Sequence, residues 1–359
     1  VELKVDDARF ANPDAQGDVQ VTWRTGRKPG FGPGARLPGE IDLSGRIVRA
    51  RAERVAAYLP LGVPQSVRRY VERSVRSGTA EAATFSVKGD AWQFPFTGQR
   101  EGTFRVATRV RDLRFDYVPS VPPGSDEPAW ESPWPGFGAV QGELVFDRSS
   151  MQLNGVQAQL WGLQLRQVQA RVADLGADQP LLQIDGEARG PASDLLRFVA
   201  ASPVGRWIGG GLGELSASGA ADLKLALAIP LADPAQTGVR GSVVLGGNDL
   251  RIRPGTPLLA NARGRVDFTQ RGFAVVGASA RTLGGDLSFE GGSQPDGSLR
   301  FSGQGTASAE AMRRATELGP LAAIASQLRG QASYRVALGV VQGWPELSVS
   351  SDLVGLESE

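Results

Sequence analysis

Hydrophobic residues alternate with polar ones in one segment after another of this 359-residue chain, and this period constrains the fold more than any other feature. A period of two places every second side chain on the same face of a β-strand, so the sheet has one apolar and one polar face. Turn residues separate the segments, as at 270–272 and 295–297, and they favour hairpins. The pattern predicts a mainly β fold, a long antiparallel meander of about 16 to 20 strands.

Three segments break this period and predict short helices, each with a proline near its middle. They are residues 51–76 with Pro60, residues 192–208 with Pro203, and residues 308–328 with Pro320. A glycine follows each segment, at Gly78, Gly213 and Gly330, which is typical of a helix end. Because alternation resumes after each one, the order of sheet, broken helix and sheet forms a weak internal repeat. We expect a single unit over residues 1–359 with three helical inserts.

Two stretches rich in Pro and Gly, residues 26–39 and the Pro-rich segment 119–138, predict surface loops, because alternating segments lie on both sides of each. In the second loop, Trp130 and Trp134 favour a lid folded onto the sheet. Another segment, residues 89–96, carries alternating Trp and Phe residues around Pro95. Since proline cannot donate a ladder hydrogen bond, we interpret this segment as an edge strand packed on the core.

The composition excludes whole classes of chemistry. The chain has no His and no Cys, which removes histidine-dependent catalysis, cysteine nucleophiles, disulfides and the usual zinc, haem and iron–sulfur ligands. Its 39 Lys and Arg residues balance 38 Asp and Glu residues, so we expect no basic surface for nucleic acid. We therefore predict no catalytic residue, no metal site, no cofactor and no nucleic-acid partner.

The beginning of the chain indicates a part of something longer. No secretory leader is recognisable at Val1, and the chain does not start with Met. No stretch reaches the roughly 18 apolar residues that a membrane helix needs. We interpret the chain as a soluble piece of a longer protein.

The apolar face of such a sheet must be covered by something. Three short helices, each about 10 Å across, cannot cover about 16 to 20 strands spaced about 4.8 Å apart. Three solutions stay open at this point. The sheet closes into a barrel, packs against a second sheet, or curls into a trough whose apolar interior meets an apolar ligand.

A set of short phrases, taken in their order and spacing, resembles the central region of YhdP-type proteins in the AsmA-like superfamily of Gram-negative bacteria. The resemblance extends from about Phe10 to Leu353. The phrases include LPGEIDLSGRI (37–47), GDAWQFPF (89–96), LRFDYVP (113–119), SPVGRWIG (202–209), VDFTQRGFAV (266–275) and LGGDLSFEGG (283–292).

The resemblance implies a fold, a location and a function. The family is expected to be anchored in the inner membrane and to cross the periplasm as a long curled antiparallel sheet, a groove of U-shaped section with an apolar interior. It is expected to carry phospholipids between inner and outer membranes and so support the outer-membrane permeability barrier. The membranes would be reached through parts of the full-length protein that lie outside this chain, and no protein partner is implied. The family has no catalytic motif, which agrees with the composition.

The candidates for lining such a groove are residues on the apolar phase of the alternating segments. Their hydrocarbon side chains would face inward. They are Ile41, Leu43, Phe104, Val106, Leu144, Phe146, Leu223, Leu225, Leu227, Val266, Phe268, Leu287, Phe289, Val336 and Leu338.

Three other architectures compete with the groove. A closed scaffold or assembly factor, with the sheet sealed by a second sheet, would leave no room for lipid. A carbohydrate-active β-solenoid is disfavoured by hairpin-like turns and by only four Asn residues, since solenoids often stack Asn. An outer-membrane barrel is disfavoured by the three broken helices and by aromatic residues at 7%.

Overall fold

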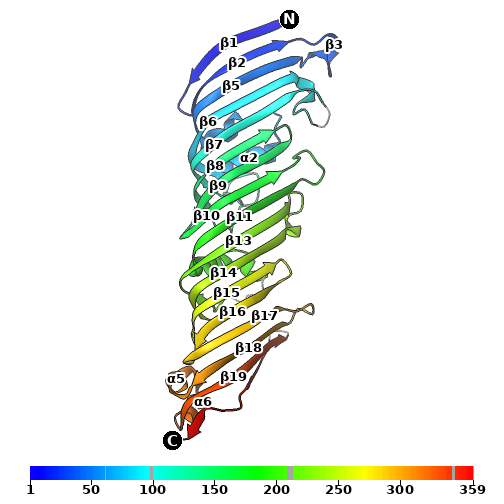
Figure 1. The fold of residues 1–359 in the computed structure, drawn as a ribbon. Helices are drawn as coiled ribbons and strands as arrows, with labels where there is room; N and C mark the ends of the chain where they lie inside the picture. Colours follow the sequence, from blue (N-terminus) through cyan, green and yellow to red (C-terminus); the bar gives the residue numbers. More distant parts are fainter. Residues whose placement is uncertain (61, 98–99, 208–212, 342–343, 359) are drawn as a thin grey trace. The chain divides into compact units, whose positions relative to one another are not determined.

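A computed structural model describes residues 1–60, 62–97, 100–207, 213–341 and 344–358. In these ranges the chain is mainly β and forms one 19-stranded antiparallel sheet with a few short helices, and a separate two-stranded sheet (Figure 1). The predicted fold class, a large antiparallel β-sheet with short helical inserts, is therefore confirmed. Contacts divide the chain into two compact units. Unit 1 comprises 1–160, 164–186 and 227–237, and unit 2 comprises 161–163, 187–226 and 238–359. The single unit expected over residues 1–359 stays a prediction.

The strands follow one another along the chain with tight turns between most of them. The first ten are β1 (Glu2–Ala11), β2 (Ala15–Arg24), β3 (Lys28–Phe31), β4 (Ala35–Leu37), β5 (Glu40–Arg51), β6 (Val75–Asp90), β7 (Thr103–Phe115), β8 (Phe137–Asp147), β9 (Ser150–Leu160) and β10 (Leu163–Val172). The others are β11 (Leu181–Pro191), β12 (Ser216–Ala217), β13 (Ala220–Pro230), β14 (Gly238–Arg251), β15 (Leu259–Thr269), β16 (Gly272–Thr282), β17 (Gly285–Ser293), β18 (Leu299–Ser308), β19 (Leu328–Val341), β20 (Trp344–Ser350) and β21 (Leu356–Ser358).

Each predicted helical segment contains two short helices: Pro60 and Pro203 lie between the two helices of their segments, and Pro320 is the first residue of the second helix of its segment. The helices are α1 (Val55–Tyr58) and α2 (Gln65–Ser74), α3 (Ala192–Ala201) and α4 (Val204–Trp207), and α5 (Ala309–Arg314) and α6 (Pro320–Ala325), with short 3₁₀ turns at Ala52–Arg54, Ala91–Gln93, Pro234–Gln236 and Thr316–Leu318. The expected glycine helix ends at Gly78 and Gly330 are wrong, because both glycines lie inside strands, β6 and β19. Strand β6 starts directly after α2, so strand pairing ends that helix. Ile208, the last residue of the second segment, lies outside the described residues.

Strands pair with their neighbours in sequence, as a meander does. The registers are antiparallel from β1 to β2, β2 to β5, and onward through β9, and again from β14 through β20. The two predicted turns, 270–272 and 295–297, connect β15 to β16 and β17 to β18. Strand β1 has one partner, β2, and β20 has one partner, β19, so the described sheet is not a closed barrel.

Bulges interrupt many of the long strands, some near the middle of the strand and others near one end. In unit 1 the bulged positions include Asp7, Ala82, Asp112, Ala139 and Gln167, which all have positive φ. The pairing registers shift beside the first four. In unit 2 the same role falls to residues 247, 261 and 277. A bulge adds one residue to one strand, so it strengthens the local twist and bends the ladder.

Each bulge also shifts the inward phase by one residue. In β9, Met151 and Leu153 share the apolar face before the bulge at Gly155, and Val156 and Ala158 share it afterwards. The side chains after the bulge are buried and those before it are half-buried. Strand β9 therefore has a sealed half and a less covered half on the same face.

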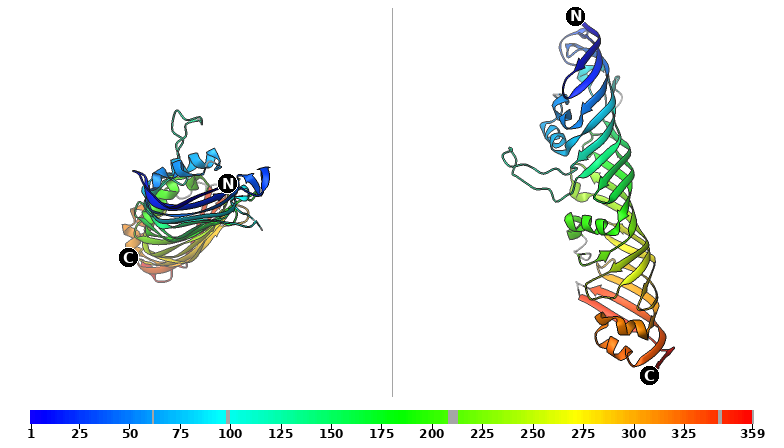
Figure 2. Two further views of the ribbon diagram at one scale, coloured as in Figure 1. Left: turned by 90° about the horizontal axis from the view of Figure 1, so that it is seen from above. Right: turned by 90° about the vertical axis from the view of Figure 1, so that its left-hand side faces the viewer.

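The sealed halves lie where the helical inserts leave and re-enter the sheet. In unit 1 the insert runs from the end of β5 to the start of β6, and the core there contains Val140, Val156 and Ala158 packed by Phe115 and Phe137. In unit 2 the insert runs from β18 to β19, beside buried residues of β16 to β19. Figure 2 shows that the helices of unit 1 lie on one side of the strands of that unit. Of 25 buried hydrophobic residues in the described ranges, 17 are alanine, so few large side chains are sealed.

Two predictions about aromatic residues are wrong. Residues 91–93 form a 3₁₀ turn instead of an edge strand, because the Asp90 carboxylate accepts a hydrogen bond from the Trp92 backbone N–H at 3.0 Å. The turn buries Phe96 and leaves Trp92 and Phe94 exposed. The lid expected from Trp130 and Trp134 is wrong for Trp130, which is 46% exposed on a loop that stands away from the strands (Figure 2), whereas Trp134 is half-buried with its ring 5.9 Å from that of Tyr117.

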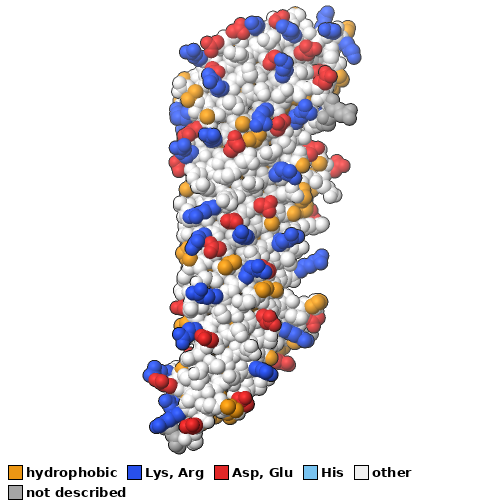
Figure 3. Space-filling view, in the orientation of Figure 1, with side chains coloured by type: hydrophobic (Ala, Val, Ile, Leu, Met, Phe, Trp, Pro, Cys, Tyr) orange, Lys and Arg blue, Asp and Glu red, His pale blue; other side chains and the backbone are white. Residues whose placement is uncertain are grey.

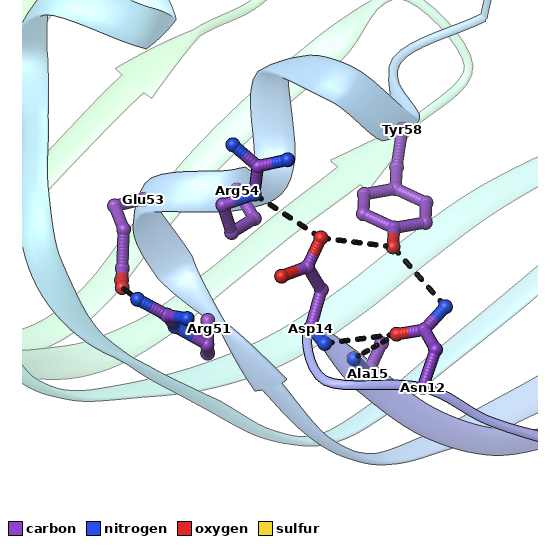
Figure 4. Close-up of polar contacts among 7 residues, drawn as sticks. All are labelled: Asn12, Asp14, Ala15, Arg51, Glu53, Arg54 and Tyr58. Atoms are coloured by element: carbon purple, nitrogen blue, oxygen red, sulfur yellow. Dashed lines mark hydrogen bonds and ion pairs between the residues drawn. The ribbon is translucent and has the colours of Figure 1, made fainter.

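A polar cluster fixes the first insert to the turn between β1 and β2 (Figure 4). Asp14 Oδ2 accepts hydrogen bonds from Arg54 Nε at 3.1 Å and from the Tyr58 hydroxyl at 3.2 Å. Asn12 Oδ1 accepts from the backbone N–H groups of Asp14 and Ala15, which shapes the turn. The Arg54 guanidinium beside Asp14 lowers the pKa of that carboxyl from its ordinary value of 3.8. The cluster therefore joins α1 to the sheet through an ionised carboxylate.

Asp14→Asn is expected to lower the thermal unfolding midpoint at about pH 7, because the amide loses the ion pair with Arg54. The folded-state pKa of Asp14 is depressed, so its contribution is present above the unfolded value of 3.8 and is lost as pH falls through the lower folded value. Midpoints of both proteins measured at about pH 7 and at about pH 2.5 check this, and the difference should be smaller at the acid pH. Asp178→Asn, in an exposed loop, is the control and should change neither midpoint. A difference as large at the acid pH as at neutral pH would contradict the role assigned to the ion pair.

Candidate functional site

The half-buried apolar side chains on the less covered halves of the strands form continuous cross-strand rows, which we call the open face. In unit 1 one row is built from directly opposed residues of five strands, and a second lies beside it. The first row is Val5, Val21, Leu43, Val87 and Phe104, and the second is Gly45, Phe85, Val106, Phe146 and Met151. Directly opposed side chains on one face of a sheet touch, so each row is a contiguous apolar strip.

Unit 2 has its own open face, built in the same way. One row runs across seven strands and another across five. The first is Val243, Val266, Val275, Gly291, Phe301, Leu338 and Leu347, and the second is Ala278, Phe289, Gly303, Val336 and Val349. At the edge strand β20, Leu347 and Val349 are 67% and 60% exposed, because no further strand covers them.

The structure places the fifteen sequence-predicted residues on the apolar phase of their strands, with intermediate burial. Fourteen are half-buried and Leu287 is buried, since it lies at the sealed end of β17 beside the last helical insert. Opposed pairs among them include Val106 with Phe146. Leu223 and Leu225 lie in unit 2 and Leu227 in unit 1, all on β13. The role of these residues in lining a groove stays a prediction.

Intermediate exposure is informative about packing. A large aliphatic side chain in a closed sandwich is covered on both sides and loses nearly all its accessible surface. In the described parts of both units, the large residues of the open face keep part of theirs, while the sealed halves are rich in alanine. The polypeptide described here therefore does not seal its own apolar face.

Aromatic rings on the open face lie against glycines of the neighbouring strand. A Cβ added to Gly45 would lie 2.5 Å from Cζ of Phe85, and one added to Gly291 would lie 2.6 Å from Cδ1 of Phe301. The Phe268 ring lies against Gly241 in the same way. Since each ring occupies the space that a side chain would need, it lies down along the sheet. The surface that results is apolar and low in relief.

Sequence reasoning missed members of these rows. Row members with side chains that were not among the candidates are Val5, Val21, Phe85, Val87, Met151, Val243, Val275, Ala278, Phe301, Leu347 and Val349. The signal for Phe85 and Val87 was present, because they lie in an alternating segment. The direct opposition of the residues depends on hairpin register, which bulges shift.

The opposite face of the sheet is polar. In the orientation of Figure 3 it carries Lys and Arg side chains interspersed with Asp and Glu, and few hydrophobic ones. Opposed residues form ion pairs across strands, such as Lys88 with Asp42 at 2.8 Å and Arg105 with Asp147 at 3.0 Å in unit 1. In unit 2, Lys224 pairs with Glu187 at 3.0 Å. Each exposed pair adds little stability, but together they keep this face hydrated and specify which face is outward.

The open face offers little that could do chemistry. Among the described residues, no three or more Asp and Glu side chains come together as a metal site would require. The tyrosine beside the open face of unit 2, Tyr334, has its phenol pKa raised by burial. No helix in the described ranges is long and apolar enough to cross a membrane. The arrangement can hold an apolar ligand by contact.

Comparison with known proteins identifies the family. The family model described as "YhdP protein" matches residues 1–359. The chain is 26% identical over 199 residues to the protein named intermembrane phospholipid transporter YhdP of Escherichia coli (strain K12), and the alignment covers 55% of this chain. It covers 14% of that protein, so the chain corresponds to a small part of its length. No solved structure matches. The predicted resemblance is confirmed: this chain belongs to the YhdP family.

Proposed function

We propose that the chain holds the acyl chains of phospholipids against its open face and so forms part of a periplasmic conduit between the inner and outer membranes. Lipid passage along such a conduit would support the permeability barrier of the outer membrane. The proposal agrees with the name of the E. coli relative, an intermembrane phospholipid transporter. The membranes at either end would be reached by other parts of the full-length protein.

The observation that carries this proposal is the incomplete burial of the open face. Each methylene of an acyl chain costs about 0.8 kcal/mol in water, so a phospholipid with roughly 30 of them cannot cross an aqueous space bare. Half-buried Leu, Val, Ile and Phe side chains in continuous rows can replace that water. Acyl chains that cover these side chains would also remove from water the apolar surface that the polypeptide itself leaves accessible.

The low relief of the open face suits a cargo that moves. The rows expose hydrocarbon side chains, so a lipid gains burial energy without a fixed hydrogen-bonding partner. Rings that lie along the sheet, such as Phe85 over Gly45, leave no deep pocket that would fix one acyl chain in place. The headgroup would stay in water at the margin of the strands. We propose no catalytic step and no cofactor for this function.

Native mass spectrometry of the purified chain tests the proposal directly. The expected result is co-purified phospholipid, released when the protein is unfolded and identified in an organic extract. A matched sample of a Leu43→Asp and Leu338→Asp variant, one change in each unit, should hold less lipid. If the unmodified chain is monodisperse, folded and free of lipid after extraction from a membrane-containing lysate, the proposal is wrong.

A further inference from the structure

A small structure at one corner of unit 1 combines exposed aromatic residues with unpaired positive charge. It is built by the short parallel strands β3 and β4, near the upper right of Figure 1. Phe31 and Leu37 are opposed in this pair and are 71% and 52% exposed. The Trp92 ring packs edge-on against Phe31 with centroids 5.1 Å apart, and 47% of Trp92 is exposed. We call Phe31, Leu37 and Trp92 the aromatic corner.

Phe94, two residues after Trp92 in the chain, extends the open face toward the segment that carries the aromatic corner. This residue follows the 3₁₀ turn that carries Trp92 and is 40% exposed. Its ring lies 4.9 Å, centroid to centroid, from that of Phe104. Phe104 is a member of the first row of the open face, opposite Val87. An apolar ligand that lies on the row therefore meets aromatic surface from Phe104 outward to solvent.

Three cations lie in the same short segments. Arg27, Lys28 and Arg36 are exposed, and among the described residues none of them forms an ion pair. The backbone holds their segments together, since Lys28 N–H donates to Gly34 O at 3.0 Å and Lys28 is opposed to Ala35. In Figure 3 this region shows Lys or Arg side chains beside hydrophobic ones.

One carboxylate of this corner, Asp90, accepts hydrogen bonds from backbone donors. Asp90 accepts from Gly34 N–H at 2.8 Å through Oδ2 and from Trp92 N–H at 3.0 Å through Oδ1. These bonds fix the β3–β4 structure to the turn that presents Trp92. Among the ion pairs of the described residues, none joins Arg27, Lys28 or Arg36 to Asp90 or to Glu40, the exposed carboxylate opposite Asp90, whereas cations on the polar face, such as Lys88, are paired.

We propose that the aromatic corner and its three cations bind the phosphodiester headgroup of an anionic phospholipid whose acyl chains lie on the open face past Phe94. This inference rests on the proposed function and adds a headgroup class and a place to it. A ligand that satisfies both features must carry a negative charge next to hydrocarbon. Phosphatidylglycerol meets that need, while the ammonium group of a zwitterionic lipid offsets its phosphate charge near the same cations. Indole and phenyl rings suit the boundary between hydrocarbon and water.

Calorimetric titration of the chain with two water-soluble dioctanoyl lipids, used as monomers, tests the proposal. Dioctanoyl phosphatidylglycerol and dioctanoyl phosphatidylcholine have the same tails and differ in headgroup. We expect the anionic lipid to bind about tenfold more tightly, since each cation near an anionic headgroup adds modest attraction. The triple variant R27Q/K28Q/R36Q should lose that preference and keep its affinity for the phosphatidylcholine. Added salt should reduce the preference as well.

The matched control is R46Q/K88Q/R105Q, which removes three cations from the paired polar face of the same unit. It should keep the preference for the anionic lipid. Equal binding of both lipids to the unmodified chain, or a loss in the control equal to that in the triple variant, would overturn the headgroup site while the proposed function stands. Binding of inorganic phosphate as tight as that of the anionic lipid would also overturn it. If neither lipid binds, both this inference and the proposed function fail.

Discussion

Replacing Leu43 in unit 1 or Leu225 in unit 2 by Asp is expected to stop lipid passage through the full-length protein. A carboxylate on the path of an acyl chain must be dehydrated each time a lipid goes by, at a cost of about 2.5–3.5 kcal/mol, which slows passage roughly hundredfold. Both leucines are half-buried and are not sealed into the core, so the sheet should tolerate the change. The measurement is outer-membrane permeability in cells whose sole copy of the gene carries the substitution, with protein levels checked.

Ser44→Asp is the control for Leu43→Asp, because Ser44 is the next residue on β5 and is exposed on the polar face. Lys224 serves in the same way beside Leu225, with Lys224→Gln as the variant. These changes should leave permeability as it is in the unmodified protein. Normal permeability in cells that carry Asp at several open-face positions, in both units, would refute a conduit along this face.

Phe96→Ala is expected to cost unit 1 about 3–5 kcal/mol of unfolding free energy, the range for emptying a buried aromatic site. Phe96 has no accessible surface and is the largest fully buried side chain in the described ranges. The Phe96 ring packs against two glycines, Gly89 and Gly102. A Cβ added to Gly89 would lie 2.8 Å from Cε1 of Phe96. Because neither glycine offers a side chain that could move into the space, the cavity should stay open.

Urea unfolding followed by circular dichroism checks this value, read as a shift of the midpoint at constant slope. The comparison is Phe94→Ala, two residues earlier and 40% exposed, which should cost about 1 kcal/mol. Equal losses from the two variants would show that the Phe96 site collapses on truncation and that the two rings act as one cluster.

The alternating pattern was enough to predict the class of fold and the side of each strand that is apolar. Apolar phase is a local property, so Leu43 and Val336 could be assigned from their own segments. The bulges could not be predicted, because Ala82, Ala139 and Gln167 have positive φ without being glycine. Pairing across the bent sheet imposes that backbone conformation against the local preference of the residue.

The sequence also could not predict that strands such as β9 and β17 have a sealed half and a less covered half. Leu287 and Phe289 follow the same alternation, yet Leu287 is buried and Phe289 is half-buried. The degree of burial depends on how close each residue lies to the last helical insert. The segment 89–96 shows a second limit. Its alternation of aromatic residues imitates a strand, but the side chain of Asp90 accepts the Trp92 N–H and starts a 3₁₀ turn. A single hydrogen bond from backbone to side chain leaves no periodic pattern in the sequence, so it could not be predicted from the alternation.

The number of strands between helical inserts has a consequence for how such chains can vary in length. In the described chain six long strands, β6 to β11, separate the first insert from the second, and six more, β13 to β18, separate the second from the third. Successive antiparallel strands run in opposite directions, so after an even number of them the polypeptide is again at the same side edge of the sheet, the side where the first of these strands began. Gain or loss of a hairpin, which is two strands, would keep every later insert at the same set of strand ends. Gain or loss of a single strand would move the later inserts to the opposite strand ends, where their helices would lie over the rows that now contact solvent. Relatives of different length should therefore differ between inserts by multiples of two strands.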